Sequence, residues 1–279
     1  MEKNMQWRYY NHALLPTCAP HETADTSALA DASLWTANSG AVFFARWTTD
    51  FDCGYETNWW YEIKDTPFEM SQLKAKRRYI LRQGAKYFEV CRIDPAEYAR
   101  ELYDVQRVAF SVYPKSYRPA VDKEAFQSGL ATSDGIFYGA FFRETGRLCG
   151  YTQISDYGSY VGLNVLKTDP AYEKYQVNAA LLEQVLTDLS DRLAAGCYIC
   201  DGERNIMHET AFQDYLEKYF GFRKAYCRLH VRYRFPVGLA VKLLYPFRTG
   251  IEGINSKTAK QIAAVLRMEN ILRSDRASE

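Results

Sequence analysis

The sequence has little of what builds metal sites and lacks a segment long enough to cross a membrane. Only four histidines occur in 279 residues, which disfavours a histidine-based metal site. No run of about 18 consecutive apolar residues is present, so we expect no transmembrane helix. The first residues are polar and lack the apolar stretch of a secretory signal, and we therefore expect a cytoplasmic protein.

The chain also lacks an excess of charge of either sign. Its 35 Lys and Arg residues balance 34 Asp and Glu residues, for a formal net charge of +1. A general duplex-binding protein needs a strong positive field, so we expect no DNA partner. The strongest local cluster of cations consists of Lys74, Lys76, Arg77, Arg78 and Arg82. This cluster is either a solvated helix face or a surface that touches phosphates of tRNA, a nucleotide or a lipid head group.

The seven cysteines are odd in number and spread along the chain, which favours reduced, buried thiols. Cys197 and Cys200 form a CxxC pattern, but no second pair follows and the residues between them are Tyr and Ile. Alternation along a strand would send their two sulfurs to opposite faces. We therefore expect buried thiols there and no metal.

Hydrophobic residues make up 47% of the chain, enough for one large domain or two modest ones. About the first 35 residues, rich in Ala, Thr, Asp and Pro, are expected to be loosely ordered. Two strands are predicted, at Ala41–Trp47 and Trp59–Lys64. A basic helix at Glu69–Gln83 follows, and Gly84 ends it in the C-cap position.

From Tyr87 onward the pattern predicts a regular alternation of strands and helices, and hence an α/β or α+β sheet with helices packed against it. A helix is expected to start at the N-cap Asp94, and the last strand, Arg228–Phe235, should have one buried face and one basic, exposed face. The remaining expected elements are the strands Tyr87–Ile93, Ile136–Arg143, Leu148–Ile154, Tyr160–Lys167 and Cys197–Cys200, and helices over Val177–Leu193 and Asn205–Tyr219.

Two segments carry a family resemblance. They resemble the GNAT acyltransferase fold, and the likeness extends over about residues 86–235. The segments are Leu166–Leu186 (LKTDPAYEKYQVNAALLEQVL) and His208–Phe222 (HETAFQDYLEKYFGF). The resemblance implies an α+β fold, a mixed and mostly antiparallel sheet flanked by helices. Leu73–Val90 resembles more weakly the basic helix that joins the two GNAT-like units of Fem-type peptidyltransferases. Residues 1–85 would then be a reduced first unit with a β-hairpin and that helix, and residues 236–279 a helical extension.

The resemblance implies an acyl donor, normally acyl-CoA, and a donor site at the end of a strand and the start of the next helix. Two neighbouring strands would diverge just before Gln176 to admit the carbonyl end of the donor. Glu173, Gln176 and Asn178 stand where the family pattern has Arg, Gly and Gly, and Fem-type enzymes, which use aminoacyl-tRNA, also lack the glycine loop. The candidate donor-binding residues are Val165, Lys167, Gln176, Val177, Asn178 and Ala179, with no metal.

Candidate catalytic residues follow from the same resemblance. Tyr215 matches the family's acid, which returns a proton to the leaving group, and His208 stands where the family has Asn. The two are seven residues apart, so one helix face would carry both. For the general base, Asp201 and Asp156 are the nearest carboxylates, because each follows a strand at the edge where sites of open sheets form.

Three functions remain open. The first is transfer of an acyl group from acyl-CoA to an amine or hydroxyl of a small-molecule or cell-envelope precursor. The second is Fem-type transfer from aminoacyl-tRNA to a peptidoglycan-like precursor, and the third is a non-catalytic binding module. The apolar stretch Val237–Phe247 is too short to span a bilayer. It either docks on the domain, which we favour, or makes a peripheral contact with a membrane surface.

Overall fold

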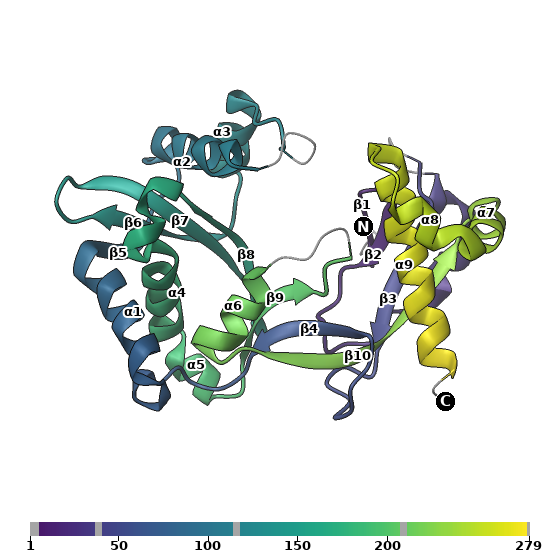
Figure 1. Ribbon diagram of the computed structural model, residues 1–279, viewed down its shortest axis with the longest axis horizontal. Helices are drawn as coiled ribbons and strands as arrows, with labels where there is room; N and C mark the ends of the chain where they lie inside the picture. Colours follow the sequence, from purple (N-terminus) through teal and green to yellow (C-terminus); the bar gives the residue numbers. More distant parts are fainter. Residues whose placement is uncertain (1–5, 37–40, 114–117, 207–210, 278–279) are drawn as a thin grey trace, which may run out of the picture. The chain divides into compact units, whose positions relative to one another are not determined.

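The computed structural model describes residues 6–36, 41–113, 118–206 and 211–277 (Figure 1). It contains two compact units, and neither is continuous in sequence. Unit 1 comprises Met1–Glu62, Glu203–Thr210 and Lys224–Glu279, and unit 2 comprises Ile63–Gly202 and Ala211–Arg223. The predicted division at residues 85 and 235 therefore differs from the structural one. Three strands, β4 (Trp59–Lys64), β9 (Tyr198–Glu203) and β10 (Arg223–Tyr233), have residues in both units.

Unit 2 is built on a mixed sheet. Its strands are β5 (Phe88–Ile93), β6 (Ile136–Phe142), β7 (Arg147–Asp156), β8 (Tyr160–Thr168) and β9, in the order β5-β6-β7-β8-β9. The neighbours from β5 to β8 pair antiparallel, and β8 pairs with β9 in parallel. The predicted α+β class, with a mostly antiparallel mixed sheet, is confirmed.

Helices cover both faces of this sheet. Successive side chains of its strands point to opposite faces, and apolar side chains occur on both, so each face needs a covering layer. On β6, Tyr138 packs in the core with α1 (Ala75–Tyr87) and α4 (Val177–Asp188). Its neighbour Phe137 packs on the other face, with α2 (Ala99–Ser111) and α3 (Lys123–Ala131). Figure 1 shows α2 and α3 on the side of the sheet opposite to α1 and α4.

The remaining elements of unit 2 surround α4. The 3₁₀ turn η4 (Pro170–Tyr175) leads into it, α5 (Ser190–Ala194) follows it, and α6 (Ala211–Phe220) packs on the same core. Element order in unit 2 is thus that expected from the resemblance, with α3 as an additional helix.

Three helix boundaries differ from the predictions. Helix α1 runs from Ala75 to Tyr87, so Gly84 lies inside it and is not its C-cap. Asp94 accepts a hydrogen bond from the Ala96 backbone N–H in a turn, and α2 begins only at Ala99. The predicted long helix is divided at Leu189 into α4 and α5.

Unit 1 contains the strands β1 (Trp7–Tyr10), β2 (Ala13–Pro16) and β3 (Phe44–Thr49), in the order β1-β2-β3-β10-β4. The expectation of a loosely ordered first segment is wrong. Two 3₁₀ turns, η1 (Thr26–Ala30) and η2 (Ala32–Trp35), pack with these strands around a core of Trp7, Leu14, Leu29 and Trp35. Both indole N–H groups are satisfied locally, since Trp7 donates to the Asp25 carbonyl and Trp35 to the Leu29 carbonyl.

The basic face of β10 is less exposed than predicted. His230 stacks on Trp47, with ring centroids 5.4 Å apart, and its Nε2 lies 2.8 Å from the Thr49 hydroxyl. Arg234 donates to the Trp35 carbonyl at 3.0 Å. These side chains therefore close the edge of the unit 1 core.

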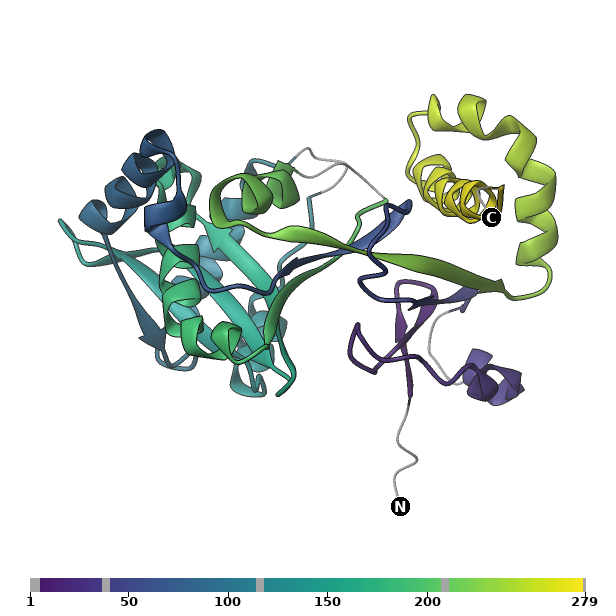
Figure 2. The same cartoon turned by 90° about the horizontal axis from the view of Figure 1, so that it is seen from below.

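After β10 the chain is helical, with α7 (Val237–Leu244), η5 (Tyr245–Phe247), α8 (Arg248–Glu252) and α9 (Lys257–Ala277). Figure 2 shows these helices on one side of β10 and the turns η1 and η2 on the other. Among the described residues, no helix combines the length and the hydropathy that crossing a membrane requires.

Candidate functional site

The neighbouring parallel strands β8 and β9 pair over only three residues each. The register joins Tyr160 to Tyr198 and ends with Gly162 opposite Cys200. Beyond these positions β8 continues to Thr168 and β9 to Glu203, with no further pairing between these two described strands. The predicted divergence of two strands before Gln176 is confirmed.

A β-bulge lies in β8 at the point where the strands diverge. Leu163 pairs with Ile154 and Val165 pairs with Gln153, so Asn164 has no partner in the ladder. The extra residue reverses the alternation of side chains: Leu163 packs in the core with α4, whereas Val165 packs on the opposite face with α2. A bulge re-aims the backbone as well as the side chains, and bulges are common beside active sites.

Asp201 is the first residue of β9 beyond the paired stretch. It lies two residues after Ile199, which packs in the core with α4 and α6, so its side chain is on that same face. Gln213 of α6 hydrogen-bonds to the carboxylate, which favours the ionised form. Burial outweighs this bond and raises the pKa of Asp201 to about 7, from an ordinary value of 3.8.

The other candidate base, Asp156, is already engaged. Its carboxylate accepts a backbone N–H from Gly158 at 2.9 Å and an ion pair from Arg192 at 2.5 Å. These contacts lower the pKa of Asp156, so it stays ionised and paired at neutral pH. Arg192 also donates to the Sγ of Cys197, which is a free thiol.

Tyr215 lies on α6, but its side chain points to a different side of the helix from that of Gln213. Two residues apart on a helix correspond to about 200° of rotation, so the side chain that reaches Asp201 and the Tyr215 side chain diverge. The Tyr215 ring packs against Tyr219 and Phe220, with centroids 5.0 and 5.6 Å away. Burial, with a smaller contribution from Tyr219, raises the pKa of Tyr215, so its hydroxyl keeps its proton. His208 lies outside the described residues.

The first turn of α4 is largely closed. Gln176 precedes it in the left-handed conformation, at φ 67°. Val177 and Ala179 have no exposed surface, and the Asn178 side chain accepts a hydrogen bond from Thr168 at 2.9 Å. Gly84 of α1 packs directly on this turn.

Val165 and Lys167, the two candidate residues on β8, lie on the face of the sheet that α2 covers. The Val165 carbonyl accepts a hydrogen bond from the Thr152 hydroxyl at 2.7 Å. The Lys167 ammonium lies 4.9 Å from the centroid of Phe110 and 5.6 Å from that of Tyr113. The structure therefore groups the described candidate residues other than Asp156 into four places: at Asp201, in the aromatic cluster around Tyr215, at the start of α4, and beneath α2.

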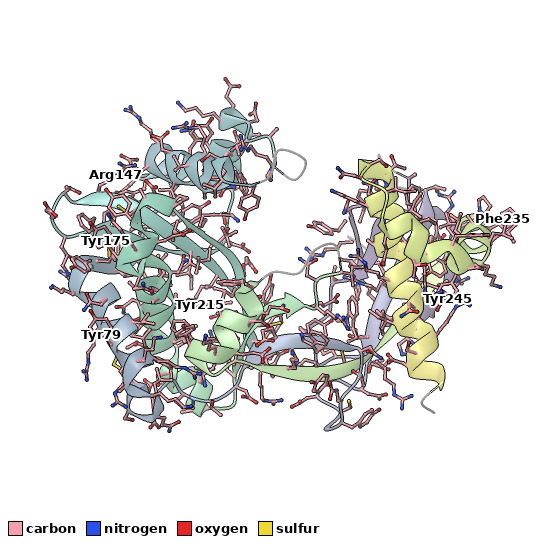
Figure 3. The ribbon with its side chains drawn as sticks, viewed as in Figure 1. Tyr79, Arg147, Tyr175, Tyr215, Phe235 and Tyr245 are labelled. Atoms are coloured by element: carbon pink, nitrogen blue, oxygen red, sulfur yellow. The ribbon has the colours of Figure 1, made fainter. Side chains whose placement is uncertain are left out.

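A pocket of about 350 Å³ opens beside the start of α4. Its walls are α1 and the end of η4, and Figure 3 labels one residue from each wall, Tyr79 and Tyr175. Lys174 supplies a cation, and Gln176 is the lining residue next to α4. The pocket-lining residues are Tyr79, Ile80, Gln83, Tyr87, Lys174, Tyr175 and Gln176.

Sequence reasoning missed Gln213 and the α1 side of this pocket. Neither has a local signal: Gln213 matters because α6 folds back on β9, and Tyr79 and Gln83 because α1 packs on α4. Only long-range packing brings them to the candidate site.

A coenzyme A pyrophosphate would need free backbone N–H groups at the start of α4. The residues present fit this group poorly, since Val177 and Ala179 are buried and Asn178 is bonded to Thr168. Glu173 adds an exposed negative charge to the approach. The closed turn thus offers no cradle of the usual kind.

Comparison with known proteins shows the fold. No family model and no curated protein matches the chain. The structure of L-PGS from Bacillus licheniformis is similar, with a TM-score of 0.51 and 10% identity, over 87% of this chain and 84% of that one. The C-terminal domain (DUF2156) of a putative lysylphosphatidylglycerol synthetase from Agrobacterium fabrum gives a TM-score of 0.50 at 10% identity, over 85% and 82%.

A smaller part of the chain matches a GNAT-type enzyme. The PaiA N-acetyltransferase from Thermoplasma acidophilum, in complex with coenzyme A, covers 40% of this chain and 77% of its own, with 19% identity and a TM-score of 0.32. The fold of the chain is the one it shares with L-PGS and the Agrobacterium domain over most of its length, and it agrees with the GNAT-like resemblance of the sequence.

Proposed function

We propose that unit 2 transfers an acyl or aminoacyl group to an amine or hydroxyl, with Asp201 as the general base. One observation carries this proposal. The carboxylate with a pKa of about 7 stands at the position where β8 and β9 cease to pair. A base titrating near neutral pH can both accept a proton and exist in its ionised form under working conditions.

The chemistry is a direct displacement at the donor carbonyl. The acceptor nitrogen or oxygen forms a bond to the carbonyl carbon, and the ester or thioester bond of the donor breaks. The proton of the attacking group passes to Asp201. The backbone around the Asn164 bulge is the candidate for polarising the carbonyl oxygen, because its N–H groups lie outside the regular ladder.

The leaving group needs a proton, and Tyr215 remains the candidate donor. Its raised pKa keeps the phenol protonated at neutral pH, as an acid must be. Its ring lies in an aromatic cluster away from the Gln213 side of α6. Gln213, which holds the base, and Tyr215 leave α6 in different directions, so base and acid would be two separate groups.

Among donors, we favour an aminoacyl ester of tRNA. The start of α4 lacks a pyrophosphate cradle, and α1 with its N-cap residue carries the exposed cations Lys74, Lys76 and Arg82. Arg77 and Arg78 are less available, because Arg77 lies over the Tyr219 ring and Arg78 donates to the Leu73 carbonyl. The Agrobacterium domain with the same fold is named for a lysyl-bearing product, which is in line with an aminoacyl donor.

Acyl-CoA is the second candidate donor. It is favoured by the pocket beside α4, where Lys174 and the tyrosines could hold a nucleotide phosphate and base. In this alternative the pyrophosphate would lie between α1 and η4 and would leave the first turn of α4 uncontacted.

Binding measurements with aminoacyl-tRNA and with acetyl-CoA distinguish the two candidate donors. We expect bulk aminoacyl-tRNA to bind the full chain with an affinity that falls steeply with salt, and the triple variant Lys74→Gln, Lys76→Gln, Arg82→Gln to bind at least about tenfold more weakly. Lys123→Gln, an exposed lysine on α3, is the matched control. Binding of acetyl-CoA that raises the melting temperature, with no tRNA binding, would identify acyl-CoA as the donor.

The transfer proposal has its own test. The protein is incubated with charged donor and a mixture of amine and hydroxyl acceptors, and loss of the acyl group from the donor is followed. We expect Asp201→Asn to abolish donor consumption while donor binding persists. Equal rates for the variant and the wild type would exclude Asp201 as the base.

A further inference from the structure

Large apolar side chains are concentrated on the surface of one short segment of unit 1. Thirteen are exposed among the described residues of the chain, and six of these lie within Phe235–Ile254. Phe235 is 84% exposed, Phe247 66% and Leu243 64%. The six are Phe235, Leu239, Leu243, Leu244, Phe247 and Ile254. Clustering of this kind marks an interaction surface, because single exposed apolar residues are ordinarily scattered.

The exposed apolar face of α7 differs from the face by which the helix packs on the rest of unit 1. Leu239 and Leu243 are one turn apart and share a face, which is exposed. Val241 lies on the opposite side of α7 and is buried. The following turn is fixed to α9, since the Tyr245 hydroxyl donates to Asn270 at 2.8 Å. Figure 3 shows Phe235 projecting outward near α7, away from α9. The preferred expectation that this stretch docks on the domain therefore holds for one face only.

The charged residues of α7 and of the turn after it are cations, and Glu252 further along is paired with Arg267. From Arg228 to Ile251 the sequence contains five Arg or Lys residues and no Asp or Glu. Lys242 is exposed and lies on α7 beside Leu243. Arg248 lies over the Tyr245 ring at 4.5 Å. The surface thus combines projecting apolar side chains with two cations, Lys242 and Arg248.

We propose that α7 and η5 form a docking surface for an anionic lipid bilayer. The exposed Phe and Leu side chains would enter the boundary between head groups and acyl chains, while Lys242 and Arg248 would face the anionic head groups. A second copy of the chain is a poorer occupant, because a symmetric contact would place the same cations against one another. This inference is independent of the proposed transfer reaction and uses no residue assigned to it.

The experiment is vesicle binding by the full chain. Vesicles of phosphatidylcholine with phosphatidylserine are compared with vesicles of phosphatidylcholine alone, by co-sedimentation at low and high salt. We expect binding to the mixed vesicles that weakens as salt rises. The double variant Leu239→Ser, Leu243→Ser should bind at least about tenfold more weakly, and Lys242→Gln severalfold more weakly.

Matched controls separate docking from general stickiness and from unfolding. Val112→Ser removes an apolar side chain that is 62% exposed in unit 2, and Lys123→Gln removes an exposed cation there. Both should bind vesicles like the wild type, and all variants should keep the wild-type melting temperature because the altered side chains are exposed.

Three results would overturn the proposal: no binding to the anionic vesicles, equal binding by the Leu239→Ser, Leu243→Ser variant, or equal loss in Val112→Ser. Dimers that disappear in the leucine variant, without vesicle binding, would show a self-association surface and would also overturn it. Asp201→Asn should bind vesicles normally, so failure of docking and failure of the transfer reaction are distinguishable.

Discussion

Gly84 of α1 lies against Ala180 of α4 so closely that the glycine has no room for a side chain. A Cβ on Gly84 would be 3.2 Å from the Ala180 Cβ and 3.0 Å from the Gln176 carbonyl oxygen. This contact allows α1 to cover the first turn of α4, which is where a GNAT-like donor site would open. It is therefore one physical reason that the start of α4 is closed.

Replacing Gly84 by a larger residue is not expected to raise the free energy of unfolding, as it usually does for a glycine inside a helix. Gly→Ala normally stabilises a helix interior by about 0.5–1 kcal/mol. At Gly129 of α3, where a Cβ would meet nothing within 4 Å, we expect Gly129→Ala to show that gain. At Gly84 the contact with α4 backbone should cancel it, so Gly84→Ala should be neutral or destabilising, and Gly84→Val destabilising by more than about 1 kcal/mol. Denaturant unfolding measures all three, and an equal gain at both glycines would contradict the packing.

The buried carboxyl of Asp201 should make stability depend on pH. Below pH 3.8 the group is protonated in both states and has no effect. Between 3.8 and about 7 it ionises in the unfolded chain but not in the folded one, so stability falls as pH rises and is lowest above 7. The full effect is on the order of 3 to 4 kcal/mol. Asp201→Asn should therefore melt several degrees higher than the wild type at pH 8 and equally at pH 4, and a pH-independent difference would refute the shifted pKa.

The same carboxyl should set the pH profile of transfer. Donor consumption should rise through about pH 7, as Asp201 ionises and becomes a base. Gln213 stabilises the ionised form by its hydrogen bond, so Gln213→Leu should move the midpoint of the profile to higher pH. Gln184→Leu, which alters a glutamine bonded to Asp188 on α4, should leave the midpoint unchanged. If the Gln213 variant shifts nothing, the bond does not tune the base.

Tyr215 is tested by removing only its hydroxyl. The hydroxyl makes no hydrogen bond within the part of the chain that is described, so Tyr215→Phe should change the free energy of unfolding by less than about 0.5 kcal/mol. If Tyr215 is the acid that protonates the leaving group, Tyr215→Phe should still lower the transfer rate at least about tenfold. Tyr219→Phe is the control, because that ring packs in the same aromatic cluster. Equal rates for Tyr215→Phe and the wild type would leave Tyr215 a packing residue only.

Local patterns predicted much of unit 2. Apolar and aromatic runs bounded by turn residues predicted β4 and β8 to within a residue, although the bulge at Asn164 left no signal in the sequence. The divergence of β8 and β9 came from the resemblance carried by Leu166–Leu186, and the structure confirms it. The N-terminal segment was misjudged, because its four buried anchors are spaced irregularly along turns and leave no periodic signal.

The sequence by itself determined the local elements, the likeness to a transferase fold and the list of side chains that could do acid–base chemistry. Only the tertiary structure decided which of them can act. A carboxylate acquires a pKa near 7 when distant segments exclude water from it, as happens at Asp201, while Asp156 meets an arginine and stays ionised. Likewise, an apolar run becomes a surface only if folding leaves it uncovered, and that depends on where α9 lies against α7. Burial and exposure are properties of long-range packing, which no local pattern contains.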